Sequence, residues 1–70
     1  MKYVGLKQVL KAVNNGEVTK VYIGKDAEEH LLDELIDSCK EKNIEIIEVD
    51  TMVELGSMAG IEVKAATAAE

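Results

Sequence analysis

Two short apolar runs constrain the fold of this chain more than any other feature. Val21-Tyr22-Ile23, within residues 18–24, is a continuous β-prone run that predicts a strand buried on both faces. Residues 44–50, with four β-branched positions, predict the next strand. Segments with helical periodicity lie before, between and after these runs. Because the connections are only a few residues long, the chain must alternate strands and helices in packed layers.

The first helix is predicted over residues 6–15. Gly5 is an acceptable N-cap, Gln8 stands three residues on as in a capping box, and Asn14-Asn15-Gly16 supplies the stop. One face of this helix carries apolar residues at positions i, i+3, i+4 and i+7: Leu6, Val9, Leu10 and Val13. Residues 2–4 before it form a short extended start.

Two further helices follow the apolar runs. Asp26 is the predicted N-cap of the second helix and Asn43 its stop. Thr51 and Glu54 predict a capping box for a short third helix, which runs to about Met58 and is ended by a glycine at position 60. The buried stripe of the second helix is predicted to consist of Ala27, Leu31, Leu32, Leu35, Ile36 and Cys39.

A closing strand is predicted over the small, apolar residues 63–69. The resulting order, β-α-β-α-β-α-β, predicts an α/β fold, a three-layer α/β/α sandwich with a mixed four-stranded sheet. Seventy residues allow one domain, residues 1–70. Because the chain has no Phe or Trp, its core must come from Val, Ile, Leu, Ala and Met.

Charge is divided unevenly along the chain. The net charge is −6, yet residues 1–25 hold five lysines against one acid, giving +4, and residues 26–70 hold three lysines against thirteen acids, giving −10. The chain has no arginine, so any basic contact to a phosphate must come from lysine. The single cysteine cannot form an internal disulfide, and no apolar run approaches the roughly 20 residues of a membrane span. We expect a cytoplasmic monomer that does not bind membranes.

Catalytic and metal-binding groups are sparse, and we expect no enzyme activity, metal or cofactor. His30 lies at helical spacing from carboxylates, but a solvated acidic helix face explains this pattern better than a metal site. Cys39 has apolar neighbours and fits a small core residue better than a nucleophile. Gly56 and Gly60 lack the sequence context of a phosphate-binding loop.

Two glycine-marked segments remain as candidate binding surfaces. Lys7, Gln8 and Lys11 share one stripe near the start of the first helix, where backbone N–H groups also favour anions. This stripe could equally be the ordinary solvent-exposed face of an amphipathic helix. The second segment, residues 55–63, would present Ile61, Glu62 and Val63 after a tight turn at the edge of the sheet.

Three motifs resemble one known family, the ribosomal protein L7Ae/L30e family of kink-turn RNA binders, in its short bacterial, ribosome-associated members. Residues 4–12 resemble its Gly-x-Lys/Asn-Gln/Glu-x-x-Lys-Ala segment, and residues 21–27 resemble its strand followed by Lys/Glu-Asp-Ala/Val. Residues 55–63 resemble its Leu-Gly-x-x-x-Gly-Ile/Val-x-Val loop. The motifs occur in the family's order and together span nearly the whole chain.

The resemblance implies a non-catalytic RNA-binding protein whose partner is a structured kink-turn RNA, ribosomal or of the riboswitch type. It implies that Ile61, Glu62 and Val63 hold the extruded nucleotide. The sheared G·A pairs and adjoining backbone would be met by Gly5, Lys7, Gln8 and Lys11, and Lys25 completes the predicted RNA-binding set. The chain departs from the pattern in three ways: Ser57 stands where the family often has a basic residue, Lys64 stands where a small residue is usual, and the last strand is shortened. The alternative is a protein–protein interaction module, which the acidic segment 26–42 would serve.

Overall fold

The computed structural model describes all residues 1–70 and contains seven regular elements in the predicted order. The strands are β1 (Tyr3–Val4), β2 (Lys20–Gly24), β3 (Glu45–Val49) and β4 (Thr67–Ala69). The helices are α1 (Leu6–Asn14), α2 (Glu29–Glu41) and α3 (Met52–Met58). The alternation predicted from the two apolar runs is therefore confirmed.

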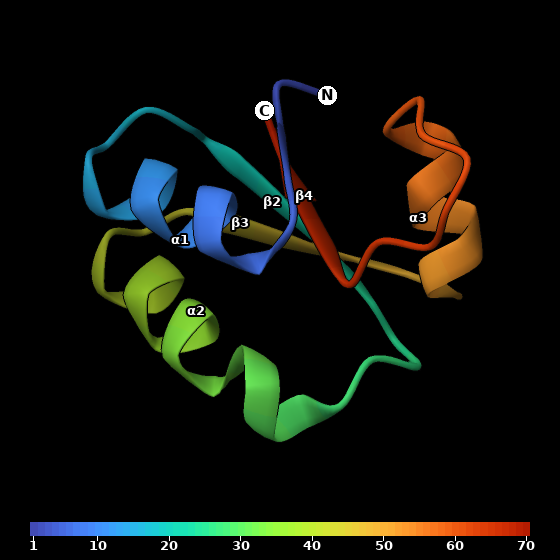
Figure 1. Ribbon diagram of the computed structural model, residues 1–70. Coiled ribbons are helices and arrows are strands. Elements are labelled where there is room, and N and C mark those ends of the chain that lie inside the picture. The colour runs from blue at the N-terminus through green and yellow to red at the C-terminus, as the bar shows by residue number, and fades with distance from the viewer.

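The four strands form one mixed sheet with the order β1-β4-β2-β3. β2 and β3 are parallel, with Val21 opposite Ile46, whereas β4 runs antiparallel to both β1 and β2. The last strand of the chain thus lies inside the sheet, next to the first. This arrangement makes the N-terminal segment and the C-terminal segment neighbours (Figure 1).

The sheet is covered on both faces, α1 and α2 lying on one side and α3 on the other (Figure 1). The core beneath α1 and α2 contains ten buried residues, with Leu35, Val9 and Val21 fully enclosed. A smaller core of four buried residues lies beneath α3: Val49, Leu55, Ala65 and Ala68. The predicted α/β/α sandwich is confirmed, and its two halves are unequal. No helix has the length and apolar character needed to cross a membrane.

The helix ends follow the predicted signals in part. Gly5 precedes α1 with φ of 97°, a conformation that favours glycine, and the Thr51 hydroxyl accepts from the Glu54 N–H at 3.0 Å. The capping box expected at Gln8 is wrong, because no side-chain hydrogen bond caps α1 and Gly5 has no side chain to take part.

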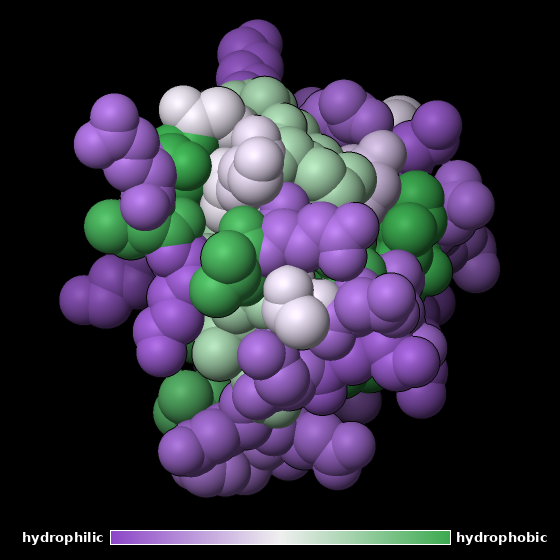
Figure 2. Space-filling view, turned by 90° about the vertical axis from the view of Figure 1, so that its right-hand side faces the viewer, coloured by the Kyte–Doolittle hydropathy of each residue, from purple (hydrophilic) through white to green (hydrophobic).

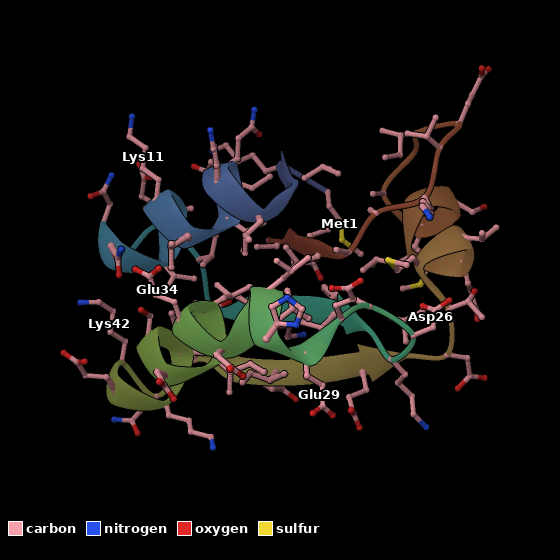
Figure 3. The ribbon with its side chains drawn as sticks, turned by 60° about the horizontal axis from the view of Figure 1, so that its bottom comes forward. Met1, Lys11, Asp26, Glu29, Glu34 and Lys42 are labelled. Atoms are coloured by element: carbon pink, nitrogen blue, oxygen red, sulfur yellow. The ribbon has the colours of Figure 1, made fainter.

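The start of α2 was also predicted wrongly. This helix begins at Glu29 with Glu28 as its N-cap, and Asp26 does not cap it. The Asp26 carboxylate instead accepts from the backbone N–H of Met52, at 2.8 Å, at the first residue of α3 (Figure 3). Leu31, in the first turn of α2, is 54% exposed and does not belong to the buried stripe. Leu32, Leu35 and Cys39 are buried as predicted.

The last strand is shorter than predicted, since only residues 67–69 pair in the sheet. Residues 61–66 form the connection from α3, so Ile61, Glu62 and Val63 lie in a loop and not in a strand. The fold therefore places this predicted binding segment beside the C-terminal end of α3.

Candidate nucleic-acid interface

The start of α1 exposes backbone donors at the positive end of the helix. Gly5 donates its N–H to the Thr67 carbonyl at 3.0 Å, which ties the helix start to β4. The next three N–H groups, of Leu6, Lys7 and Gln8, have no acceptor within the protein. Helix polarity and nearby lysines make this a favourable position for an anion.

A wide groove between β1 and α1 brings several polar side chains together. This α1 groove has a volume of about 570 Å³. Gln8 and Lys11 from the predicted stripe line it, whereas Lys7 does not, and Lys11 extends away from the helix in Figure 3. Its full lining is Lys2, Tyr3, Gln8, Lys11, Ala12, Asn15 and Glu17. Two lysines and two amides thus surround one groove, with Glu17 as its only acid.

A second depression lies where the starts of all three helices meet the segment before β4. This apolar hollow has a volume of about 290 Å³. Leu6 from α1 and the exposed Leu31 from α2 contribute to its walls, and Lys64 supplies a cation. Its full lining is Leu6, Ala27, Glu28, Leu31, Leu32, Met52, Lys64 and Ala66. A concave, mostly apolar surface with one lysine and one carboxylate at its polar positions suits a flat aromatic group that carries hydrogen-bonding edges, such as a base.

The turn after α3 is a Schellman motif, which explains the spacing of its two glycines. Gly60 has φ of 82° and donates to the Ser57 carbonyl at 3.1 Å, while Ile61 donates to the Gly56 carbonyl at 3.0 Å. Ile61 then packs against the α3-side core that contains Leu55. The hydrophobic contact typical of this motif is therefore present.

Gly56 is required for a different reason. A Cβ at this position would collide with the carbonyl oxygen of Val63, so only glycine lets the loop pass so close to α3. Farther along, Ala65 donates its N–H to the Met52 carbonyl at 3.0 Å. The loop is thus bonded to α3 at both ends, while Glu62 and Val63 between them are exposed.

The structure brings the predicted site residues together in two groups and leaves one apart. Gly5, Lys7, Gln8 and Lys11 cluster at α1, and residues 61–63 lie beyond α3. The Gly5–Thr67 hydrogen bond connects the first group to the strand into which the second leads. Both groups lie on the upper side of the molecule in Figure 3. Lys25 lines neither the α1 groove nor the apolar hollow.

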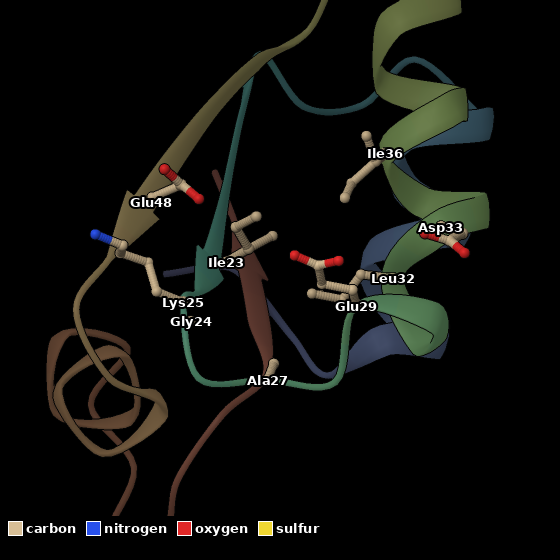
Figure 4. Close-up of a pocket in the computed structure, with 9 residues that line it drawn as sticks. All are labelled: Ile23, Gly24, Lys25, Ala27, Glu29, Leu32, Asp33, Ile36 and Glu48. Carbon is tan, nitrogen blue, oxygen red and sulfur yellow. The ribbon is translucent and has the colours of Figure 1, made fainter.

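Lys25 belongs to a third depression, between α2 and strands β2 and β3 (Figure 4). This acidic hollow has a volume of about 270 Å³, and Glu29, Asp33 and Glu48 contribute carboxylates around the single lysine. It belongs to a larger acidic region, since residues 26–50 hold ten acids and two lysines, giving −8. Positive and negative surfaces thus occupy different parts of the fold.

Sequence reasoning did not single out several residues that the geometry places at the interface. Lys2 lines the α1 groove, and Leu6, Lys64 and Ala66 line the apolar hollow. The basic character of Lys2 was visible in the sequence, as was the unusual lysine at position 64. The hollow itself was not visible, because its walls come from four separate segments.

The remaining candidate groups have structural explanations. Cys39 is fully buried in the main core, and burial raises the pKa of its thiol, which favours the unreactive neutral form. His30 is exposed and lies 3.3 Å from the Glu28 carboxylate. No three His, Cys, Asp or Glu side chains are grouped so that they could hold a metal ion.

The α3 side also exposes apolar side chains. Val53 and Val63 are each 69% exposed, and Met58 is 48% exposed. Figure 2, which faces this side of the molecule, shows the apolar surface as separate patches between polar side chains. The apolar surface on this side is therefore not one continuous face.

Fold and geometry define a small α/β/α sandwich domain with a basic helix start beside an apolar hollow. The chain belongs to the ribosomal protein L7Ae/L30e/S12e/Gadd45 family, whose model matches residues 3–70. The resemblance seen in its three motifs is thereby confirmed.

Known relatives are similar over most of this chain. An RNA-binding protein of Caldanaerobacter subterraneus subsp. tengcongensis is 56% identical over 69 residues, covering 99% of this chain and 84% of the relative. The large ribosomal subunit protein eL8 of Halobacterium salinarum is 36% identical over 66 residues, covering 93% of this chain and 55% of the relative. The solved structure of a Giardia lamblia 15.5 kDa RNA-binding protein matches with a TM-score of 0.86 and 25% identity, covering 94% of this chain and 56% of that one.

Proposed function

We propose that this chain is a non-catalytic RNA-binding protein that recognises kink-turn RNA through the start of α1 and the apolar hollow. The observation that carries the proposal is the position of Leu6. Its backbone N–H belongs to the free donors of α1, and its side chain lines the hollow. One residue therefore joins a surface suited to a polyanion backbone with a surface suited to an unstacked base.

In this proposal, the start of α1 contacts the sheared G·A pairs and the adjoining RNA backbone. The Gln8 amide can donate to and accept from a base edge, while Lys7 and Lys11 supply charge to phosphates. Gly5 has no side chain and open space around the position of a Cβ, which allows RNA to approach the backbone closely. Lys2, across the α1 groove, extends the positive surface.

In the apolar hollow, the extruded nucleotide would lie between the leucines and Met52, with Lys64 near its phosphate. The loop with Ile61, Glu62 and Val63 forms the adjacent rim in this proposal. Ser57 is exposed on α3 and provides no positive charge. Lys25, placed among carboxylates, would contribute least of the predicted residues.

The relatives support an RNA partner, since names that include RNA binding recur among them. The ribosomal relative supports association with ribosomal RNA. We expect the protein to cosediment with ribosomal subunits in a sucrose gradient at low salt. Absence from every ribosomal fraction would contradict the ribosomal role and leave kink-turn binding intact.

The decisive experiment compares two RNAs that differ only in the kink. Affinity is measured by gel shift, at one stated salt concentration, for a kink-turn RNA and for the same RNA with its G·A pairs replaced by Watson–Crick pairs. We expect binding to the first to be at least about fivefold tighter, because one lost base-edge contact costs about 1 to 3 kcal/mol. Equal affinity for both RNAs would overturn the proposal.

The acidic hollow favours a second candidate function, that of a protein–protein interaction module. It combines apolar side chains, Ile23, Leu32 and Ile36, with carboxylates, and it shares no lining residue with the α1 groove. A pull-down from lysate with and without nuclease separates the two functions. A partner retained after complete RNA digestion supports the interaction module, and loss of every partner contradicts it.

A further inference from the structure

Asp26 lies in the connection between β2 and α2, and its carboxylate makes a hydrogen bond to the start of a different helix, α3. Its Oδ1 atom accepts from the backbone N–H of Met52 at 2.8 Å, joining residues 26 positions apart. Thr51 already caps α3 through the Glu54 N–H. The start of α3 is therefore held by two acceptors, one local and one from the connection between β2 and α2.

The backbone of Met52 is held by two hydrogen bonds and by close packing against Gly24. While Asp26 holds its N–H, its carbonyl accepts from the Ala65 N–H at 3.0 Å. Gly24 packs so closely that an added Cβ would lie 3.1 Å from the Met52 Cα and 2.7 Å from its Cγ. The end of β2 and two connecting segments thus converge on Met52.

The Met52 side chain forms part of the wall of the apolar hollow, opposite segments that carry Leu6 and Leu31. Asp26 does not line this hollow. We propose that Asp26 is a positioning residue, which sets how tightly the hollow holds an extruded base by fixing the place of Met52. The inference rests on the proposed function and assigns a residue that acts on the RNA through another.

A purely electrostatic effect of Asp26 and a positioning effect predict opposite changes in RNA affinity when the carboxylate is removed. If Asp26 only repelled phosphates, removing its carboxylate would strengthen RNA binding. If it positions Met52, Asp26→Ala weakens binding despite the lost negative charge. Asp26→Asn keeps an acceptor oxygen for the Met52 N–H and should retain most of the wild-type affinity.

The test is a double-mutant cycle that combines one change in the protein with one change in the RNA. Affinities of wild type and Asp26→Ala are measured for a kink-turn RNA and for the same RNA with an abasic extruded nucleotide. For the intact RNA we expect Asp26→Ala to bind about five- to tenfold more weakly, in the range of coupling between groups that share a partner. For the abasic RNA, the two proteins should agree within about twofold.

Two further variants complete the design. Asp33→Ala removes one exposed carboxylate that lines the acidic hollow and not the apolar one, so it controls for charge. Gly24→Ala should reproduce the Asp26→Ala pattern, because its Cβ displaces Met52 from the other side. Thermal unfolding of each variant checks that the fold persists at the assay temperature.

The outcomes distinguish this inference from the proposed function. If wild type fails to prefer the kinked RNA, the proposed function fails. If wild type prefers it but Asp26→Ala loses the same affinity for intact and abasic RNA, Asp26 does not act on the base and the inference is overturned. Stronger binding by both Asp26→Ala and Asp33→Ala would also overturn it and leave charge as the explanation.

Discussion

The two faces of the sheet differ in how they hold the surfaces that lie above them. α1 rests on a core of ten buried residues, whereas the core beneath α3 has four. The loop after α3 is held mainly by backbone contacts: the Schellman hydrogen bonds, the Ala65–Met52 bond and the passage of Val63 over Gly56. Side-chain packing therefore stabilises the basic helix start, and backbone geometry stabilises the loop beside the hollow.

The largest effects should come from truncating one leucine in each core. Leu35 and Leu55 are both fully buried, so Leu35→Ala and Leu55→Ala should each cost about 2 to 5 kcal/mol in urea unfolding. Their local effects should differ. Amide exchange of Ile61 and Ala65 should accelerate more in Leu55→Ala than in Leu35→Ala at equal loss of stability, because Ile61 packs against the α3-side core. Identical exchange patterns would remove the distinction between the two faces.

A smaller loss is expected from Gly56→Ala. The added Cβ meets a backbone carbonyl that cannot move without displacing the loop, so we expect a loss of about 1 to 3 kcal/mol in the free energy of unfolding. Gly60→Ala is the matched control, since its cost of about 1 to 2 kcal/mol would come from the positive φ alone, with open space around the Cβ. If both glycines have been assigned correctly, only Gly56→Ala alters the chemical shifts of Val63 and Lys64 substantially.

Substitutions of Gln8 and Lys11, which both line the α1 groove, should affect RNA binding in different ways. Gln8→Ala should reduce discrimination between kinked and Watson–Crick RNA by about 1 to 3 kcal/mol, because a base-edge contact is lost. Lys11→Ala should weaken both RNAs alike and reduce the slope of log affinity against log salt by about one. Titrations at several salt concentrations measure both effects. Interchanged effects would reverse the assignment of base and phosphate contacts.

The smallest effect concerns an exposed hydrogen bond between β2 and the residue after β4. The Tyr22 hydroxyl donates to Glu70 Oε1 at 2.6 Å, and this hydrogen bond, with lesser effects of desolvation and nearby carboxylates, raises the Tyr22 pKa above 10.0. Because the folded-state pKa is the higher one, the resulting stabilisation is present below about pH 10 and is lost as pH rises through the folded-state pKa. In a Tyr3→Phe background, tyrosinate absorbance should show Glu70→Gln lowering the pKa. An unchanged titration would contradict the role of Glu70.

Local sequence signals predicted the elements of this fold well. The apolar runs placed β2 and β3, and the pair Thr51 and Glu54 placed the start of α3, because these signals act within one turn or one strand. The glycine at position 60 was predicted to end the third helix, and it does so in the structure. The Schellman motif needs only residues 55–61, so it could be read from their order.

The sequence-based predictions were wrong where contacts between segments distant in sequence decide the structure. Asp26 stands where a helix cap is expected, yet its carboxylate bonds to α3, which no local pattern reveals. Leu31 fits the period of a buried stripe, but in the first turn of α2 only its neighbour Leu32 is buried, and Leu31 lines the apolar hollow. Residues 63–66 were predicted to belong to the last strand, but Val63 and Lys64 pass over Gly56 and Ala65 bonds to Met52. The apolar hollow could not be predicted for the same reason, since four segments build its walls.

The separation of charge between the α1 side and the acidic region around α2 has a kinetic consequence. A polyanion approaching this molecule is repelled by the net charge of −6 at long range, and the α2 side repels it most. Close to the surface, only the lysine-bearing side attracts it. If the chain binds a polyanion as proposed, encounters through the acidic region should separate more readily than encounters through the lysine-bearing α1 surface.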